Sequence, residues 1–286
     1  MDPLTQGVVG AVASQQSVNK KTYLLATIIG FLSGLTPDLD IFIRSYEDPL
    51  LALEFHRQFT HSLIFIPIGG LICATVFYYL FAKRNDLTFK KTYIFSILGY
   101  GTHGLLDSCT SYGTQLFWPF SNHRVSWNTI SIIDPMFTIP LLIFIIIAVV
   151  KKNKIFSRIA FIWIIMYFIL GIVQHERAKY FGKQIALSRG HTPVTILVKP
   201  SIANLLVWKI IYSTKKNYYV DAVKIGLKNK IYEGSKINKL DVNKSFPWLD
   251  SNSQQAKDLE RFRWFSSGYL AISKNHPSRI IDIRYS

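Results

Sequence analysis

Three short motifs in the first half of the chain carry imidazoles and carboxylates, the side chains that bind divalent metal ions and transfer protons. The motifs contain Asp38 and Asp40, then His56 and His61, then His103 and Asp107. Because imidazole nitrogens and carboxylate oxygens suit zinc and similar ions, we interpret the three motifs as parts of one metal site. Six candidate ligands are enough for more than one ion.

The local spacing within the motifs agrees with ligands at the ends of helices. His103 and Asp107 are four residues apart, which places both on one face of a helix. Pro37 disfavours helix for the residue before it, so a helix is expected to end near Asp38. The alternative for any single histidine is a structural role, because a histidine beside an apolar segment readily finds hydrogen-bond partners.

Arg57 lies between the two histidines of the second motif. A guanidinium can hold a phosphate or a carboxylate through two parallel hydrogen bonds, which suggests a role in anion binding. The alternative is an ion pair with Glu54 or with one of the aspartates.

Composition shows what must position these motifs. The chain has 286 residues, of which 49% are hydrophobic and 17% charged, whereas ordinary soluble domains carry about 25% charged residues. Long apolar runs continue to about Gly171, and polar sequence follows from His175. The net charge of +16 lies partly in lysine clusters that border the apolar runs, which fits membrane topology better than nucleic-acid binding. No nucleic-acid partner is predicted.

Five apolar segments approach the length of about 20 residues that a helix needs to cross a bilayer. They are Thr22–Ile43, Ser62–Ala82, Thr92–Leu106, Ile132–Val150 and Ile155–Gly171. Basic clusters between them should be cytoplasmic by the positive-inside rule. That threading places the three motifs at one external membrane depth and the polar C-terminal domain outside. Asp2-Pro3 predicts a short helix before the first span, with Asp2 as its N-cap.

The expected fold class is mainly α: a multi-span helical membrane domain with a small α+β C-terminal domain. The predicted boundaries are 1–174 for the membrane domain, 175–204 for a connector and 205–286 for the polar domain. In the polar domain, Val207–Tyr212 and Tyr218–Ile225 predict a β-hairpin. A helix is expected over Asn252–Phe265, and further strands are expected over Tyr269–Ser273 and Ile280–Ile283.

The motifs resemble those of the YdjM-like family of bacterial membrane-bound metal-dependent hydrolases. The matching segments are Met1–Thr5, Pro37–Asp40, His56–Ser62, His103–Asp107, Tyr112–Thr114, Phe117–Phe120 and Ile133–Pro135. The resemblance covers about the first 175 residues. It implies a multi-pass protein of the bacterial inner (plasma) membrane and a metal site at Asp38, Asp40, His56, His61, His103 and Asp107. In one departure, Gln6 stands where the family usually has histidine.

The leading functional hypothesis is a hydrolase whose divalent metal, most simply zinc, polarises an ester or phosphoester and activates a water molecule. Asp40 or Asp107 would act as general base, and Arg57 would stabilise developing negative charge. A distant likeness of the family to zinc-dependent phospholipases C suggests phosphoester substrates, and a site near the membrane interface suits a lipid from the surrounding bilayer.

A non-enzymatic membrane protein is the competing hypothesis. In such a protein the His/Asp cluster would hold helix ends together through a metal or ion pairs, and the C-terminal domain would bind a partner. A transporter is less favoured, because the spans show no inverted repeat. The sequence does not indicate an oligomeric state.

Overall fold

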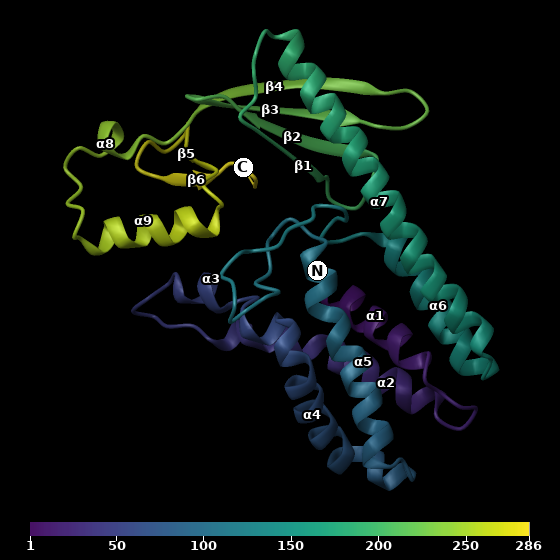
Figure 1. The fold of residues 1–286 in the computed structure, drawn as a ribbon. Coiled ribbons are helices and arrows are strands. Elements are labelled where there is room, and N and C mark those ends of the chain that lie inside the picture. Colours follow the sequence, from purple (N-terminus) through teal and green to yellow (C-terminus); the bar gives the residue numbers. More distant parts are fainter. Residues whose placement is uncertain (286) are drawn as a thin grey trace. The chain divides into compact units, whose positions relative to one another are not determined.

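The computed structural model describes residues 1–285 and confirms the predicted fold class, mainly α with an α+β C-terminal region (Figure 1). Its contacts divide the chain into two units. The membrane unit comprises Met1–Ile43, Phe55–Val173 and Ile202–Leu205. The C-terminal unit comprises Arg44–Glu54, Gln174–Ser201 and the chain from Leu206 onward. An internal segment, Arg44–Glu54, therefore groups with the C-terminal part of the chain.

The helices of the membrane unit are α1 (Pro3–Gln15), α2 (Tyr23–Leu35), α4 (Ile66–Phe77), α5 (Phe89–Ser108), α6 (Pro135–Lys151) and the first part of α7 (Lys154–Ser188). Tighter or wider helical turns extend them: 3-10 turns at η1 (Thr36–Phe42), η2 (Phe59–His61), η3 (Leu63–Phe65) and η5 (Lys83–Asn85), and a π-helical turn at η4 (Tyr78–Ala82). Helix α3 (Leu51–Phe55) lies mostly in the C-terminal unit.

Three helical stretches are long and apolar enough to cross a membrane: Tyr23–Phe42, Leu63–Asn85 and Lys154–Ser188. Helix α6 is apolar but shorter. The expected span at Thr92–Leu106 is helical, as α5, but it is not among the three. Helix α5 is less apolar than the three because it packs against α1, α2 and α4 and buries polar side chains inside the unit.

Large apolar side chains remain exposed on α4, α6 and α7. They include Ile68, Leu71, Ile72, Ile139, Ile143, Ile146, Ile162, Ile165, Met166 and Ile169. Soluble proteins rarely expose contiguous apolar surface on this scale. These faces are therefore the surface that contacts lipid.

Glycines bring α1, α2 and α5 into close contact. A Cβ atom at Gly10 would lie 2.4 Å from the Gly30 carbonyl oxygen, and one at Gly99 would lie 2.5 Å from the same oxygen. Small residues permit this approach, which is the usual packing of helices in membranes. The predicted N-cap of α1 is confirmed, since the Asp2 carboxylate accepts a hydrogen bond of 3.0 Å from the Thr5 backbone N–H.

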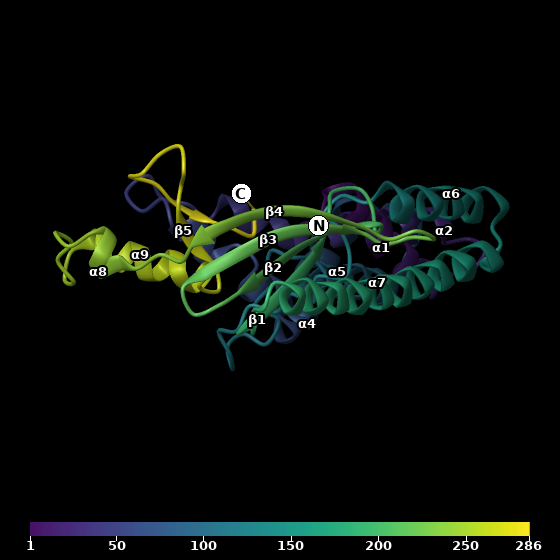
Figure 2. The ribbon, with the colours of Figure 1, turned by 90° about the horizontal axis from the view of Figure 1, so that it is seen from above.

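The C-terminal unit is built on an antiparallel sheet in the order β1 (Thr195–Pro200), β2 (Val207–Ser213), β3 (Asn217–Lys224) and β4 (Lys230–Asn238). The later part of α7 packs along this sheet, where a Cβ at Gly182 would meet Ile210 at 3.0 Å and Ile196 at 3.1 Å (Figure 2). The short helix α8 (Val242–Ser245) precedes α9 (Gln254–Phe265), and β5 (Leu270–Ile272) pairs with β6 (Ile280–Asp282).

Several elements of this unit match the sequence-based predictions. The β2–β3 hairpin is confirmed, with Ser213 opposite Tyr218, and so are α9, β5 and β6. Strands β1 and β4 were not predicted. Strand β4 is an edge strand whose residues are almost all exposed, so it lacks the alternating apolar pattern that identifies a half-buried strand.

Candidate metal centre

The membrane unit brings all three motifs together. Asp38 and Asp40 lie on η1, directly after α2, and Pro37 sits near the start of that turn. His61 ends η2, and His103 and Asp107 lie one turn apart in the last part of α5. His56 directly follows α3. As predicted, the side chains of the three motifs converge, and the distances between their donor atoms show this.

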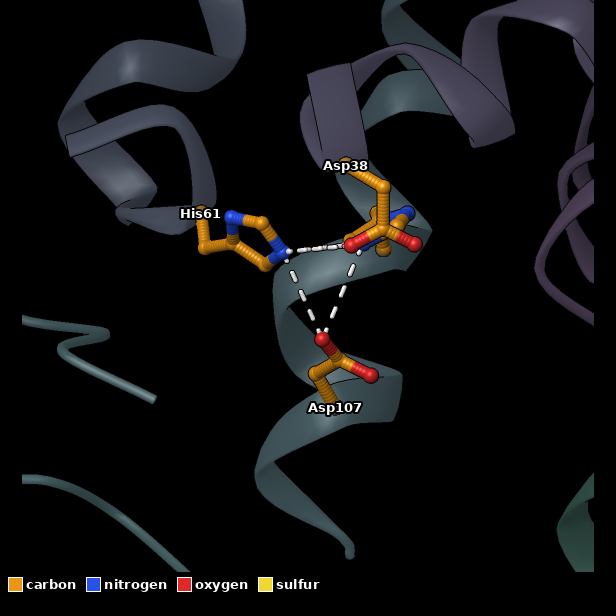
Figure 3. A group of neighbouring side chains, drawn as sticks. Asp38, His61 and Asp107 are labelled. Atoms are coloured by element: carbon orange, nitrogen blue, oxygen red, sulfur yellow. Dashed lines mark hydrogen bonds and ion pairs between the residues drawn. The ribbon is translucent and has the colours of Figure 1, made fainter. Parts of the chain in front are cut away.

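Asp38, His61, His103 and Asp107 form the first group (Figure 3). His61 Nε2 lies 3.4 Å from Asp38 Oδ1 and 3.4 Å from Asp107 Oδ2. His103 Nε2 lies 3.3 Å from Asp38 Oδ1, 3.7 Å from Asp107 Oδ2 and 3.0 Å from His61 Nε2. Zinc binds nitrogen and oxygen at about 2.0–2.2 Å in a tetrahedron, so its ligands stand roughly 3.3–3.6 Å apart. The distances of 3.3 and 3.4 Å fall in this range, and those of 3.0 and 3.7 Å lie just outside it, so the group is close to the dimensions of a four-ligand metal site.

The backbone of α2 orients His103 for this role. His103 Nδ1 lies 2.6 Å from the Gly34 carbonyl oxygen. A carbonyl only accepts, so Nδ1 carries the proton and donates it there. The lone pair of Nε2 in the neutral ring then faces Asp38, His61 and Asp107. Metal-binding histidines are commonly fixed in this way by a hydrogen bond at the other ring nitrogen.

Asp38, Asp40 and His56 form a second group, with one ligand atom from each residue within 4.8 Å of the others. Asp38 thus belongs to both groups. The Asp40 carboxylate is held from several sides: Oδ1 lies 2.7 Å from His56 Nδ1, while Oδ2 accepts from the Arg57 backbone N–H at 3.0 Å and from the Thr60 hydroxyl at 2.8 Å. A carboxylate shared by two groups suits a pair of neighbouring ions.

Arg57 supports the site from beside Asp107. Its Nε lies 2.9 Å from Asp107 Oδ2, and its Nη1 donates to Thr110 at 3.2 Å. Its backbone has a positive φ of 66°, which non-glycine residues rarely adopt without compensation. Two hydrogen bonds of the Arg57 backbone compensate for this conformation. Its N–H donates to the Asp40 carboxylate, and its carbonyl accepts from the Gln115 N–H at 2.9 Å.

Asp107 also contacts α1. The Gln6 amide donates to Asp107 Oδ1 at 2.9 Å, and the amino group of Met1 contacts the same oxygen. Within residues 1–285, the Gln6 Oε1 atom is buried without a hydrogen-bond partner. Such an atom is costly unless something binds it. Gln6 thus reaches the centre, at the position where the resembled family has histidine.

Burial separates an inner part of the site from an outer part. Asp40, His61, His103 and Asp107 are buried, whereas the side chains of Asp38 and His56 are 24% and 21% exposed. A molecule that reaches the centre must therefore approach past Asp38 and His56.

Sequence reasoning missed the residues that support the ligands. Thr60 holds Asp40, and the Tyr112 ring lies edge-on to His56 with Arg57 4.6 Å from its centroid. Arg124 is buried, and it donates to the Gly113 carbonyl at 2.8 Å.

Gly104 fixes the separation of the two inner histidines, and replacing it should damage the site. A Cβ at Gly104 would lie 2.1 Å from the His61 carbonyl oxygen, so Gly104→Ala should push His61 away from His103. We expect a loss of about 1–3 kcal/mol in stability together with weaker metal binding, measured by thermal unfolding and metal content in detergent. Gly101→Ala is the control, because its Cβ would meet only the Ile66 side chain, at 3.3 Å; equal effects of both changes would contradict this role.

Comparison with known proteins agrees with these observations. The sequence model of the YdjM inner membrane protein family matches residues 1–178, which include all six candidate ligands. The uncharacterized protein YfhP of Bacillus subtilis is 24% identical over 271 residues, covering 91% of this chain and 77% of that protein. The inner membrane protein YbcI of Escherichia coli is 29% identical over 107 residues, covering 36% of this chain and 60% of its own length. No solved structure matches the chain.

The family match, the inner-membrane relative and the three apolar helices together confirm the predicted localisation in the inner membrane. The match extends over more than half of the chain and includes every ligand motif. The chain therefore belongs to the YdjM family of inner membrane proteins.

Proposed function

We propose that this protein is a metal-dependent hydrolase of the inner membrane that cleaves an ester or phosphoester at the cluster formed by Asp38, Asp40, His56, His61, His103 and Asp107. Zinc is the metal that the ligand set suits best, because two imidazoles and two carboxylates form the inner group, with separations close to those of a tetrahedral site. The observation that carries the proposal is this convergence of donor atoms, 3.0–3.7 Å apart, from helices far apart in sequence.

Burial makes the cluster hard to explain without a cation. Carboxylates that lie together in a low-dielectric interior repel each other, and ionisable groups within a membrane domain usually mark a functional site. Arg57 and the amino group of Met1 both contact Asp107. Asp38 Oδ1 faces the Nε2 atoms of His61 and His103, and because the neutral His103 ring carries its proton on Nδ1, the His103 lone pair points toward this oxygen without neutralising its charge.

Bound divalent ions would polarise the scissile ester and activate water for attack. The chain's own residues would do the rest. Asp40 and Asp107 remain the candidate general bases, and Asp40 is the better placed because its Oδ1 is bonded to the partly exposed His56. A proton accepted at Asp40 can leave through the His56 ring. Arg57 would stabilise negative charge that develops on the substrate.

The substrate is proposed to be a lipid or lipid-linked phosphoester. On the open side of the cluster, Asp38 lies near the end of the membrane-crossing stretch Tyr23–Phe42, and His56 follows that stretch in the chain. A substrate that diffuses within the bilayer can reach a site in such a position. An anionic phosphoester would also find the Arg57 guanidinium beside the ligands.

The proposal is tested first by metal content. Detergent-purified wild type should contain near-stoichiometric zinc or another divalent metal, and His61→Ala should lose it, because His61 contributes to the buried four-ligand group. Both proteins are checked for folding by size-exclusion chromatography and circular dichroism. The wild type and the variant are then compared for cleavage of chromogenic phosphodiesters and of phospholipids in mixed micelles.

The outcomes separate the enzyme from the competing hypothesis. Metal-dependent cleavage by wild type, absent from a folded His61→Ala variant, would support the hydrolase. Metal that stabilises the fold, with no cleavage of any ester class, would instead support a structural cluster in a protein that acts through partners. A folded, stable and metal-free wild type would contradict both the hydrolase and the metal site.

A further inference from the structure

The segment Arg44–Glu54 links two parts of the metal centre but packs with another part of the protein. Along the chain it follows η1, which carries Asp38 and Asp40, and it ends just before His56. Its contacts nevertheless place it in the C-terminal unit. The stretch of chain that joins Asp40 to His56 is therefore held by contacts within the C-terminal unit.

One residue, Arg261 on α9, makes the ion pairs that hold this segment. Its Nη1 and Nη2 donate to the two Asp48 carboxylate oxygens at 2.9 and 2.8 Å, and its Nε donates to Glu54 at 2.5 Å. Asp258 on the same helix adds a contact of 3.0 Å that orients the guanidinium. This is the two-pronged geometry for which arginine is suited and lysine is not.

The surroundings of these groups favour a specific contact over a loose surface pair. The side chains of Arg261, Glu54 and Asp48 are 21%, 32% and 37% exposed, so the cluster is partly shielded from solvent. Arg261 lies more than 200 positions from both partners in the chain. Hydrogen bonds from Arg261 hold the pKa of the Asp48 carboxyl below its usual value. Arg57, which sequence alone allowed to pair with Glu54, pairs with Asp107 instead. The two arginines thus have separate partners.

Glu54 is two residues before His56, within α3. Ligands must stay within about 0.5 Å of their productive positions. The Asp40 carboxylate holds His56 and the Arg57 N–H directly, and a fixed connection at Glu54 limits the movement of the backbone that carries them. We propose that Arg261 is a positioning residue for the outer metal group of Asp38, Asp40 and His56, so that the C-terminal unit controls metal binding there. This role rests on the proposed metal site and gives the C-terminal unit a function within it.

The test compares Arg261→Ala with Arg263→Ala in the full-length protein in neutral detergent. Arg263 is the matched control because it lies on the same helix and pairs only with Glu260, at 3.1 Å, among the residues described. Zinc affinities are measured by competition with a chromogenic chelator, and amide hydrogen exchange is followed over residues 44–58. Arg261→Ala should speed exchange in this segment and weaken binding of the outer zinc ion by about 10-fold, the lower end of the effect of losing a group bonded directly to a ligand, because Arg261 acts on His56 only through Glu54 and the backbone between them.

The inner zinc ion should keep its affinity in Arg261→Ala, and Arg263→Ala should behave as wild type. Exchanging the charges, with Arg261→Glu combined with Asp48→Arg and Glu54→Lys, should restore part of the outer affinity. If wild type binds two ions and Arg261→Ala binds both equally well, the role of Arg261 is refuted while the metal site stands. A wild type that binds no zinc refutes the proposed function and this role together, whatever the exchange rates show.

Discussion

Asp38→Ala should remove nearly all bound metal, whereas His56→Ala should remove about half of it. Asp38 is the only residue that belongs to both ligand groups, so its loss takes one ligand from each ion. His56 belongs to the outer group alone. If the two groups hold about two ions per chain, as in two-metal hydrolases, the expected contents are about two for wild type, one for His56→Ala and near zero for Asp38→Ala.

The measurement is elemental analysis of detergent-purified protein, with folding checked on the same samples. Asp86→Asn is the control, because Asp86 is an exposed carboxylate of the membrane unit that lies outside both groups. His103→Ala adds a further comparison and should lose the inner ion. Equal metal loss in Asp38→Ala and His56→Ala would show that the site holds a single ion, and the shared role of Asp38 would then be wrong.

The ligands themselves could be predicted from sequence because metal chemistry restricts residue type. Few side chains bind a divalent ion, and charged or imidazole groups are conspicuous beside apolar runs. The four-residue spacing of His103 and Asp107 and the turn after Pro37 were also readable. The division of the six residues into an inner and an outer group could not be predicted from sequence, because it depends on distances between helices that only the packing of the fold determines.

The supporting residues escaped prediction for a related reason. Thr60 and Gly34 act through a hydroxyl and a backbone carbonyl, and neither feature distinguishes them from other threonines and glycines in the sequence. Arg57 was recognised as an anion binder, but its choice of Asp107 over Glu54 is set by the fold. Long-range ion pairs such as Arg261 with Asp48 leave no local pattern at all.

Most helices of the membrane unit were predicted close to their observed bounds, but α7 continues to Ser188, well beyond the predicted Ile155–Gly171, and the role of a helix in the membrane was not always predictable. Helix α5 reads as a short span because an apolar run follows Lys90 and Lys91, yet its buried residues include Ser96 and Gly99 together with two ligands. It serves as the scaffold of the site, enclosed by other helices. The external position of the C-terminal domain rests on the lysine distribution and stays a prediction.

Arg57→Ala should abolish most hydrolysis while leaving the metal in place. Arg57 touches Asp107 but is not one of the six ligands, so the zinc content should stay close to that of wild type. Removing a group that stabilises developing negative charge typically costs about 10²–10³-fold in turnover. The measurements are metal content and kcat/KM for a phosphodiester that wild type cleaves, with Arg84→Ala as an exposed control from the same unit.

Arg57→Lys distinguishes charge from geometry. Lysine keeps the positive charge and has the same backbone preferences at the positive φ of 66°, but it cannot reproduce the planar guanidinium beside the Tyr112 ring or its fork of donors. We expect Arg57→Lys to recover part of the lost activity, because a point charge near the substrate is retained. Loss of zinc from both variants in step with activity would show that Arg57 acts by holding Asp107 in place, and its proposed role toward the substrate would be wrong. Full activity in Arg57→Ala would remove Arg57 from the reaction and leave recognition of the anion to the metal ions.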